Sequence, residues 1–127
     1  MPTSAQHRDE MYEQLLAISR KAFRETSFEV AFHALSAATH RAKDLKNVQF
    51  LRELLQEAEQ QKKLIDTGYP GHPISSSSAA SRQHESIYSS LQQQISTQIR
   101  FFEMTDLLQD RSGRRTQRAT ESSGEKP

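Results

Sequence analysis

Two histidines, His33 and His40, are the residues of this sequence most suited to bind a metal ion or to accept a phosphoryl group. On a helix they lie within about 20° of each other, and their separation along the axis is about 10 Å. One metal ion cannot use both at that distance, and no histidine or carboxylate four residues away completes a ligand set on that face. We therefore expect both to be surface histidines, and the sequence predicts no metal site.

His33 has a second interpretation as a phosphoryl acceptor. The segment His33-Ala34-Leu35 is similar to the start of the H-x-L-K-G motif of histidine phosphotransfer domains, which are four-helix bundles. This resemblance implies phosphoryl transfer through His33. The similarity ends at Ser36 and Ala37, where that family has a lysine that screens the phosphoryl charge and a glycine that admits the response regulator. Phosphotransfer is therefore the least favoured alternative.

The remaining reactive side chains form no recognisable catalytic set. Glu53 and Glu57 are four residues apart, but no histidine or third acid accompanies them, and Ser75 to Ser78 have no base nearby. Cysteine is absent, which removes thiol catalysis, disulfides and thiolate metal sites. No glycine-rich phosphate loop occurs. We expect no enzymatic activity, no catalytic residue and no cofactor.

The apolar residues recur at the spacing of α-helices, and the sequence predicts an all-α fold. The first helix should run from Arg8 to about Arg24, and the second should open on a capping box formed by Thr26 and Glu29. The third should begin at an Asn47 cap and end where Gly68 takes a left-handed conformation. The predicted apolar seams of the three helices are Met11, Leu15, Ile18 and Ala22, widened by Leu16 and Phe23; Phe28, Ala31, Phe32, Leu35, Ala38 and Ala42; and Val48, Leu51, Leu54, Leu55, Ala58, Leu64 and Ile65.

Short connections force these three helices into an antiparallel bundle. The predicted organisation is a frayed terminus at 1–7, a three-helix core at 8–66 and a flexible Pro/Ser linker at 67–80. A long fourth helix follows at 81–110, and we expect it to pack back on the core. Its seam consists of Tyr88, Leu91, Ile95, Ile99 and Phe102.

Near the end of the fourth helix, large apolar residues point away from its seam. They are Phe101, Met104, Leu107 and Leu108. Such a cluster predicts an apolar anchor for another protein. Two structural alternatives are that it caps the core of the bundle or forms a homodimer interface.

The final segment, 111–127, contains little to bury and is predicted to be a disordered basic tail. Its arginines could contact nucleic-acid phosphates, although no aromatic residue is interleaved for base stacking. They are Arg111, Arg114, Arg115 and Arg118. Nucleic-acid binding is the alternative function, and a solubilising tail is the simpler interpretation.

Composition sets the broad class. The 127 residues suffice for one domain, with 34% hydrophobic residues, 26% charged residues and a net charge of +1. No signal peptide and no run of about 20 apolar residues is present, so we expect a cytoplasmic protein without a membrane-spanning segment.

Residues 15–43 resemble one helical hairpin of the tetratricopeptide repeat. Leu15, Ile18, Ser19 and Ala22 match its first helix, and Phe28, Ala31, Leu35 and Ala38 match its second. The pattern departs at Ala22, where the family favours an aromatic residue, and at Lys43, near its usual proline. The resemblance implies protein or peptide binding. We therefore expect a non-catalytic interaction or scaffold module with another protein as its partner.

Overall fold

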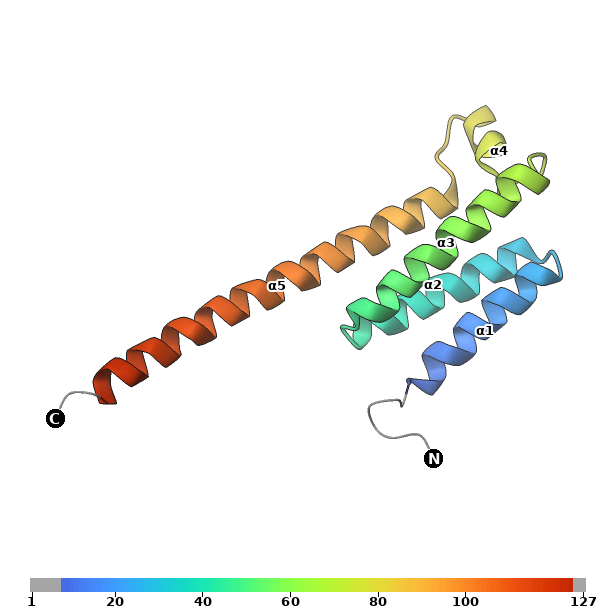
Figure 1. Cartoon of the computed structure of the whole chain (residues 1–127). Coiled ribbons are helices and arrows are strands. Elements are labelled where there is room, and N and C mark those ends of the chain that lie inside the picture. The colour runs from blue at the N-terminus through green and yellow to red at the C-terminus, as the bar shows by residue number, and fades with distance from the viewer. Residues whose placement is uncertain (1–7, 125–127) are drawn as a thin grey trace.

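The computed structural model describes the backbone of residues 8–124 and the side chains of residues 8–110. Over that range the chain forms five helices and no strand, which confirms the all-α prediction. Figure 1 labels these helices as α1 (Glu10–Arg24), α2 (Phe28–Asp44), α3 (Val48–Gly68), α4 (Ser76–Ser81) and α5 (Ile87–Gly124).

The first three helices run antiparallel to their neighbours in sequence, as their short connections require. α5 then runs back along α3 in the opposite direction, so the long helix packs on its own chain (Figure 1). The seam predicted for this helix is correct: Tyr88, Leu91, Ile95 and Ile99 are buried, and Phe102 is partly buried against them.

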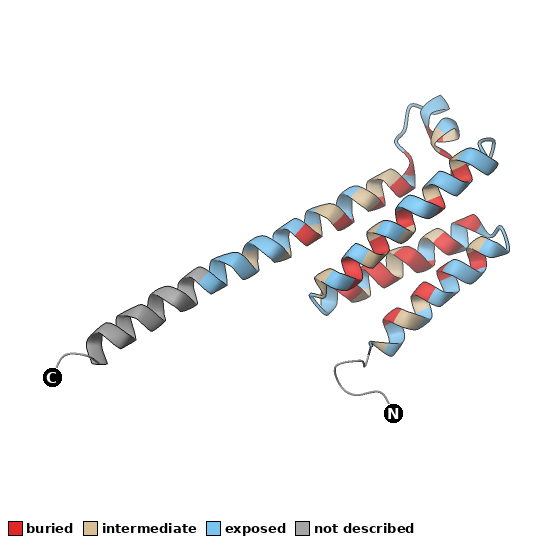
Figure 2. Ribbon diagram, viewed as in Figure 1, coloured by how far each residue is buried: buried red, intermediate tan, exposed pale blue. Residues whose placement is uncertain are grey.

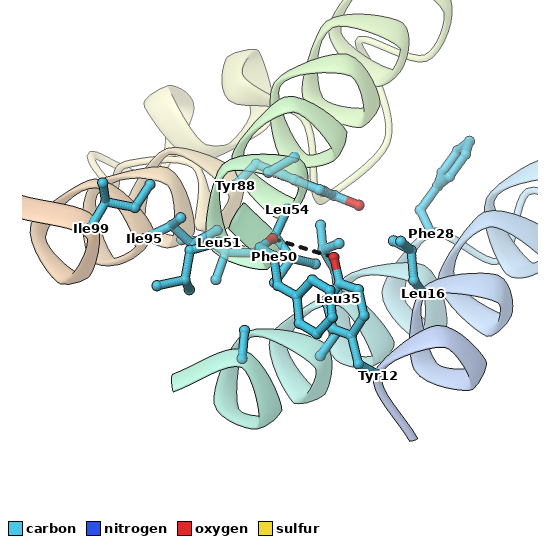
Figure 3. Close-up of a cluster of buried hydrophobic side chains, with 14 of the residues drawn as sticks. Tyr12, Leu16, Phe28, Leu35, Phe50, Leu51, Leu54, Tyr88, Ile95 and Ile99 are labelled. Atoms are coloured by element: carbon cyan, nitrogen blue, oxygen red, sulfur yellow. Dashed lines mark hydrogen bonds between the residues drawn. The ribbon is translucent and has the colours of Figure 1, made fainter. Parts of the chain in front are cut away.

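The core extends from the α1–α2 hairpin through α3 to α5. Figure 3 shows its largest side chains converging between the helices. Tyr12 and Phe50 stack with their ring centroids 4.0 Å apart, and Leu35, Leu51, Leu54 and Ile95 are fully buried. Alanines at 31, 38, 42 and 58 are fully buried as well. Their short side chains let the helix axes approach closely.

The predicted seam of α1 is correct in part. Leu16 and Ala22 are buried as expected, and Leu15 and Phe23 are partly buried against the core. Met11 and Ile18 are wrong, since they are 54% and 49% exposed, and Tyr12 and Ser19 are buried instead. Hydrophobicity alone favoured the Met11–Ile18 face. The buried face includes two hydroxyl groups instead, because both find hydrogen-bond partners inside the bundle.

The predicted capping box at Thr26 is also wrong. Thr26 has φ 60°, and its amide donates to the Phe23 carbonyl while the Ser27 amide donates to the Ala22 carbonyl. These two bonds close α1 in a Schellman motif, which needs a left-handed residue at this place. The Thr26 hydroxyl consequently donates to the Glu25 carbonyl at 2.6 Å, and α2 begins after Ser27. The Asn47 cap is correct, since its side chain accepts from the Phe50 amide at 2.9 Å.

The segment expected to be a flexible linker contains the short helix α4. Ser75 caps it, with Ser75 and Ile74 buried, and Asp66 accepts hydrogen bonds from the Ser76 amide and hydroxyl at 2.8 and 2.7 Å. The Ser-rich segment is therefore ordered by its contacts with the C-terminal end of α3. Gly68 is the last residue of α3, not a left-handed cap, and the Tyr69 amide closes the helix on the Ile65 carbonyl.

The bounds predicted for the long helix, 81–110, are wrong at both ends. α4 ends in a left-handed turn at Gln83, so α5 starts at Ile87. At the other end the helix continues to Gly124, through most of the segment expected to be disordered. No proline interrupts 111–124, and extending an existing helix is easier than nucleating one. The predictions for residues 1–7 and 125–127 lie outside the described residues.

α5 is much longer than the bundle that it packs on. Figure 2 shows buried positions only along its first part, and exposed positions where it extends past the N-terminal end of α3. None of the helices, over the residues that the structure describes, is long and apolar enough to cross a membrane.

Candidate functional site

The main apolar surface of α5 outside the core is a group of four side chains, which we call the distal patch. Its members are Phe101, Met104, Leu107 and Leu108, with exposed fractions of 59%, 64%, 55% and 57%. They do not cap the core within this chain, because more than half of each side chain is accessible. The structure thus gathers all four predicted anchor residues on one exposed stretch of helix.

Three members of the distal patch lie on the face of α5 opposite its buried seam. At about 100° per residue, the mean direction of Phe101, Met104 and Leu108 is roughly 165° from that of Ile95 and Ile99, and Leu107 lies on the flank, roughly 100° from the seam. A helix with apolar side chains on two opposite faces needs two packing partners. α3 covers the first face, and the second is exposed in this chain.

An ion pair marks the place where α5 leaves the bundle. Arg52 of α3 donates to Glu103 at 2.6 Å, and both side chains are 51% exposed. An exposed pair contributes at most about 1 kcal/mol. Burial of Ile95 and Ile99 must therefore supply most of the attachment of α5 to α3.

A buried chain of hydrogen bonds sets how α1, α2, α3 and α5 align. The Ser19 hydroxyl donates to the Ala31 carbonyl at 2.7 Å and accepts from the Gln61 amide at 3.0 Å. The Tyr88 hydroxyl then donates to the carbonyl oxygen of Gln61 at 2.7 Å. Burial, and secondarily the nearby Glu57 carboxylate, raises the pKa of Tyr88 well above its usual value, so this phenol stays a neutral donor. This network joins the start of α5 to α1, α2 and α3.

The sequence reasoning missed Gln61 because glutamine is usually a surface residue. A signal was present in the spacing, since Leu54, Ala58, Gln61 and Ile65 follow one another at steps of four, three and four. A polar residue on an apolar seam indicates a buried hydrogen bond.

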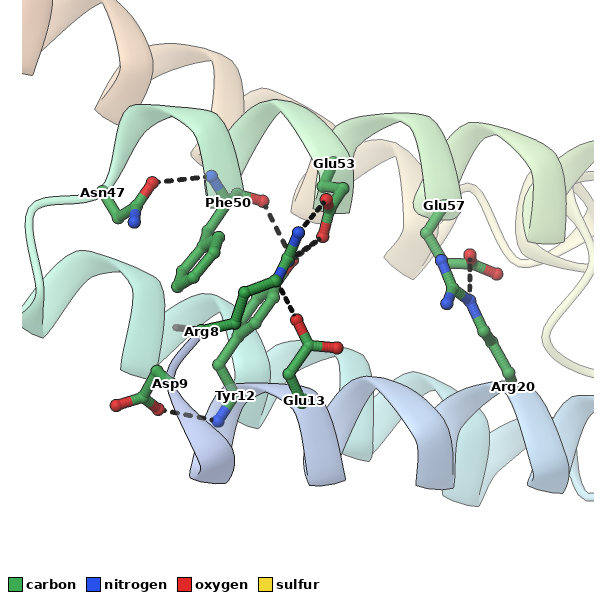
Figure 4. A network of polar contacts seen from close by, with 9 residues as sticks. All are labelled: Arg8, Asp9, Tyr12, Glu13, Arg20, Asn47, Phe50, Glu53 and Glu57. Carbon is green, nitrogen blue, oxygen red and sulfur yellow. Dashed lines mark hydrogen bonds and ion pairs between the residues drawn. The ribbon is translucent and has the colours of Figure 1, made fainter. Parts of the chain in front are cut away.

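A second polar cluster ties the start of α1 to α3 (Figure 4). Arg8 donates to both carboxylate oxygens of Glu53, at 2.7 and 3.0 Å, and the Tyr12 hydroxyl donates to Glu53 at 2.8 Å. The hydrogen bond from Arg8 is the largest cause that lowers the pKa of Glu53 below its usual value, helped by Tyr12 and opposed by burial. A carboxylate held ionised in this way is suited to a structural role and not to general acid catalysis near neutral pH.

Asp9 extends this cluster to α2. It caps α1 by accepting from the Tyr12 amide at 2.8 Å, and it receives two hydrogen bonds from Arg41, at 2.7 and 3.0 Å. The same contact raises the pKa of Arg41. Three helices are thereby joined by charged groups at one end of the bundle.

The two histidines are exposed on α2, as the sequence predicts. The His33 ring lies against Phe32, with the ring centroids 5.7 Å apart. Among the residues that the structure describes, no three His, Cys, Asp or Glu side chains are grouped as a metal site would require.

His33 also borders a hollow of about 370 Å³ between α2, α4 and α5. Its lining is mostly apolar and includes Phe32, Ile74 and Ile87. Arg82, the basic residue at its edge, donates to the Pro73 carbonyl at 3.0 Å and so supports the turn before α4. The lining of this hollow contains no nucleophile with an adjacent base, and its residues contribute to the fold.

The four arginines predicted as a nucleic-acid site, Arg111, Arg114, Arg115 and Arg118, belong to the helical backbone of α5. Their side chains lie outside the described residues, so nucleic-acid binding stays a prediction from the sequence.

The resemblance of residues 15–43 to a tetratricopeptide hairpin likewise stays a prediction. No family model matches this chain, and neither a curated protein nor a solved structure is significantly similar to it.

Proposed function

We propose that this chain is a non-catalytic protein–protein interaction module that binds its partner through the distal patch. The observation that carries the proposal is the exposure of Phe101, Met104, Leu107 and Leu108, which point away from the seam that α3 covers. The bundle acts as the scaffold that holds this part of α5 outward.

The energetics favour this role. Burying a large apolar side chain completely contributes roughly 1.5–3 kcal/mol, so covering the exposed half of four such residues contributes about 3–6 kcal/mol. Clustered apolar anchors of this type dominate the binding energy of protein interfaces. The polar clusters of the bundle support the same interpretation, since their charged and hydroxyl groups are hydrogen-bonded to one another and stabilise the scaffold.

The test compares two leucine-to-serine substitutions with similar exposure. Leu108→Ser alters the distal patch, whereas Leu64→Ser alters a leucine of α3 that is 49% exposed. Each full-length variant is used for quantitative affinity capture from the native source, alongside the unaltered protein and the double variant Leu107→Ser/Leu108→Ser.

We expect the two patch variants to lose the captured proteins while Leu64→Ser retains them. Melting temperatures should change little for all variants, because no fully buried side chain is removed. Capture of the same proteins in the same amounts by the double patch variant would show that the patch is not the binding surface.

A further inference from the structure

We infer that the partner of the distal patch is another protein that presents an acidic segment with apolar side chains. This inference rests on the proposed function and assigns the chemistry of the partner. Two features of the surface support it, namely the separation of charges around α5 and a groove that continues the patch toward the bundle.

The acidic residues of α5 lie away from the distal patch. At about 100° per residue, the acidic positions of 97–124 are about 130° or more from the mean direction of Phe101, Met104 and Leu108. They are Glu103, Asp106, Asp110 and Glu121. The ion pair of Glu103 with Arg52 of α3 agrees with this placement. A partner bound on the patch therefore does not face these carboxylates.

Basic residues lie on the same side of α5 as the distal patch. Arg100 is exposed, and its position is about 75° from the mean direction of the patch. Further along the helical backbone, positions 111, 115 and 118 lie within about 75° of the same direction, and each is an arginine. Apolar and basic residues thus share one face of the helix. Such a face is complementary to a partner that carries acidic side chains beside apolar ones.

A groove of about 570 Å³ between α2 and α5 continues this surface toward the bundle. Thr97 lines the groove, and Phe101 lies one turn further along the same side of α5. His40 and Lys43 of α2 line it as exposed side chains, and none of its described lining residues is acidic. An acidic segment bound to the patch can therefore extend into the groove.

The α5 wall of the groove is lined mainly by side chains that donate hydrogen bonds. They are Ser90, Gln93, Gln94, Thr97 and Gln98. Carboxylates and backbone carbonyls accept hydrogen bonds from such groups. Glu85 accepts from Gln93 at 2.9 Å, but it precedes Phe101 by more than about 20 Å along the axis of α5, so it does not oppose an acidic ligand at the patch.

The same surface is less suited to other ligands. Its apolar residues occupy about two turns, 101–108, and arginine positions follow on the same face, whereas an interfacial membrane helix carries its apolar stripe along its length. RNA phosphates would pair with the arginines but leave Met104 and Leu108 in water. A second copy of this chain offers the same basic face and not an acidic one.

The first experiment measures binding of labelled peptides to the full-length protein by fluorescence anisotropy. The probe is a peptide of three Leu-Glu-Glu-Leu-Glu-Glu-Gln heptads, and the two control peptides have lysine in place of glutamate or glutamine in place of leucine. We expect the acidic probe to bind with an affinity that falls as salt is added. The lysine peptide should not bind, and the peptide without leucine should bind at least about tenfold more weakly.

Charge reversals in the protein test the complementarity directly. Lys43→Glu and Arg100→Glu should each weaken binding of the acidic probe about fivefold, as loss of an exposed charge pair predicts. Lys63→Glu, at an exposed position of α3 outside the groove, changes the net charge equally and should have an effect below about twofold. The double variant Lys43→Glu/Arg100→Glu should bind the lysine peptide in preference to the acidic one.

Two neighbouring arginines test which face of α5 binds the probe. Position 115 is about 15° from the mean direction of the patch, and position 114 is about 115° from it. Arg115→Glu should therefore weaken binding about fivefold, and Arg114→Glu less than about twofold.

Three results would overturn the inference: no binding of the acidic probe, equal affinity for the lysine peptide, or equal effects of Arg100→Glu and Lys63→Glu. Stronger binding to phosphatidylserine vesicles or to a single-stranded uridine oligonucleotide would replace the acidic protein with a membrane or RNA. A dimer that Leu107→Ser/Leu108→Ser abolishes would replace it with a second copy.

The capture experiment separates this inference from the proposed function. If Leu107→Ser/Leu108→Ser loses the captured proteins while the acidic probe fails to bind, only the inference is wrong. If that variant retains the captured proteins, the proposed function fails as well.

Discussion

The proximal part of α5, residues 87–100, and its distal part, residues 101–110, belong to one continuous helix in different surroundings. The proximal part places Tyr88, Leu91 and Ile95 in the core, where each is at most 3% exposed. The distal part carries side chains of the same size that are more than half exposed. Helix formation alone therefore says little about what stabilises each part. The proximal part is stabilised by burial within the chain, and the distal part is available to bind something else.

The difference between the two parts is tested most directly by shortening one apolar side chain in each. Ile95→Ala should lower the free energy of unfolding by about 2–5 kcal/mol, because it leaves a cavity beside α3. Leu108→Ala should change it by no more than about 0.5 kcal/mol when the protein is dilute enough to be monomeric. Denaturant titration of both variants measures these values. Equal losses would mean that the distal patch contributes to the fold of the monomer.

A smaller effect tests the buried network that anchors the proximal part. Gln61→Ala removes the partner of Ser19 and the acceptor for Tyr88, and should cost about 2–3 kcal/mol. Gln94→Ala, at an exposed position of α5, is the matched control and should have almost no effect. Adding Tyr88→Phe to Gln61→Ala should cost less than the sum of the single changes, since both remove the same hydrogen bond. Additive losses would show that the two residues act independently.

The smallest effect concerns acid stability at the other end of the bundle. Because the pKa of Glu53 is lower in the folded protein than its ordinary 4.5, its pairing with Arg8 stabilises the fold above that pH. The stabilisation is lost as the pH falls through the folded pKa. Glu53→Gln should cost about 1 kcal/mol at neutral pH and make the decline of stability below pH 4.5 less steep.

Chemical denaturation at a series of acidic pH values measures this difference, with Glu59→Gln on an exposed position of α3 as the control. An unchanged acid slope for Glu53→Gln would show that Glu53 does not contribute to acid stability.

Some features were predictable because they depend on local spacing. The seam Tyr88–Leu91–Ile95–Ile99, the Asn47 cap and the three antiparallel helices all follow from the helical period and from short connections. The outward direction of Phe101, Met104, Leu107 and Leu108 was predictable for the same reason, since a fixed angle per residue separates them from the seam.

Other features depended on partners that are distant in sequence. Which face of α1 is buried was decided by Tyr12 and Ser19, whose hydroxyls reach the Phe50 and Ala31 carbonyls. Order in the Ser-rich segment depended on Asp66, ten residues before Ser76. No periodicity within one helix contains this information.

What the sequence by itself determined is therefore where helices form and which faces of them are apolar, because both depend on residues within a few turns of each other. Only the tertiary structure decided which apolar faces meet, because that choice depends on hydrogen bonds across the bundle. Gln61 is polar but buried, because Ser19 and Tyr88 are its hydrogen-bond partners. Leu108 is apolar but exposed, because no other helix of the bundle covers it.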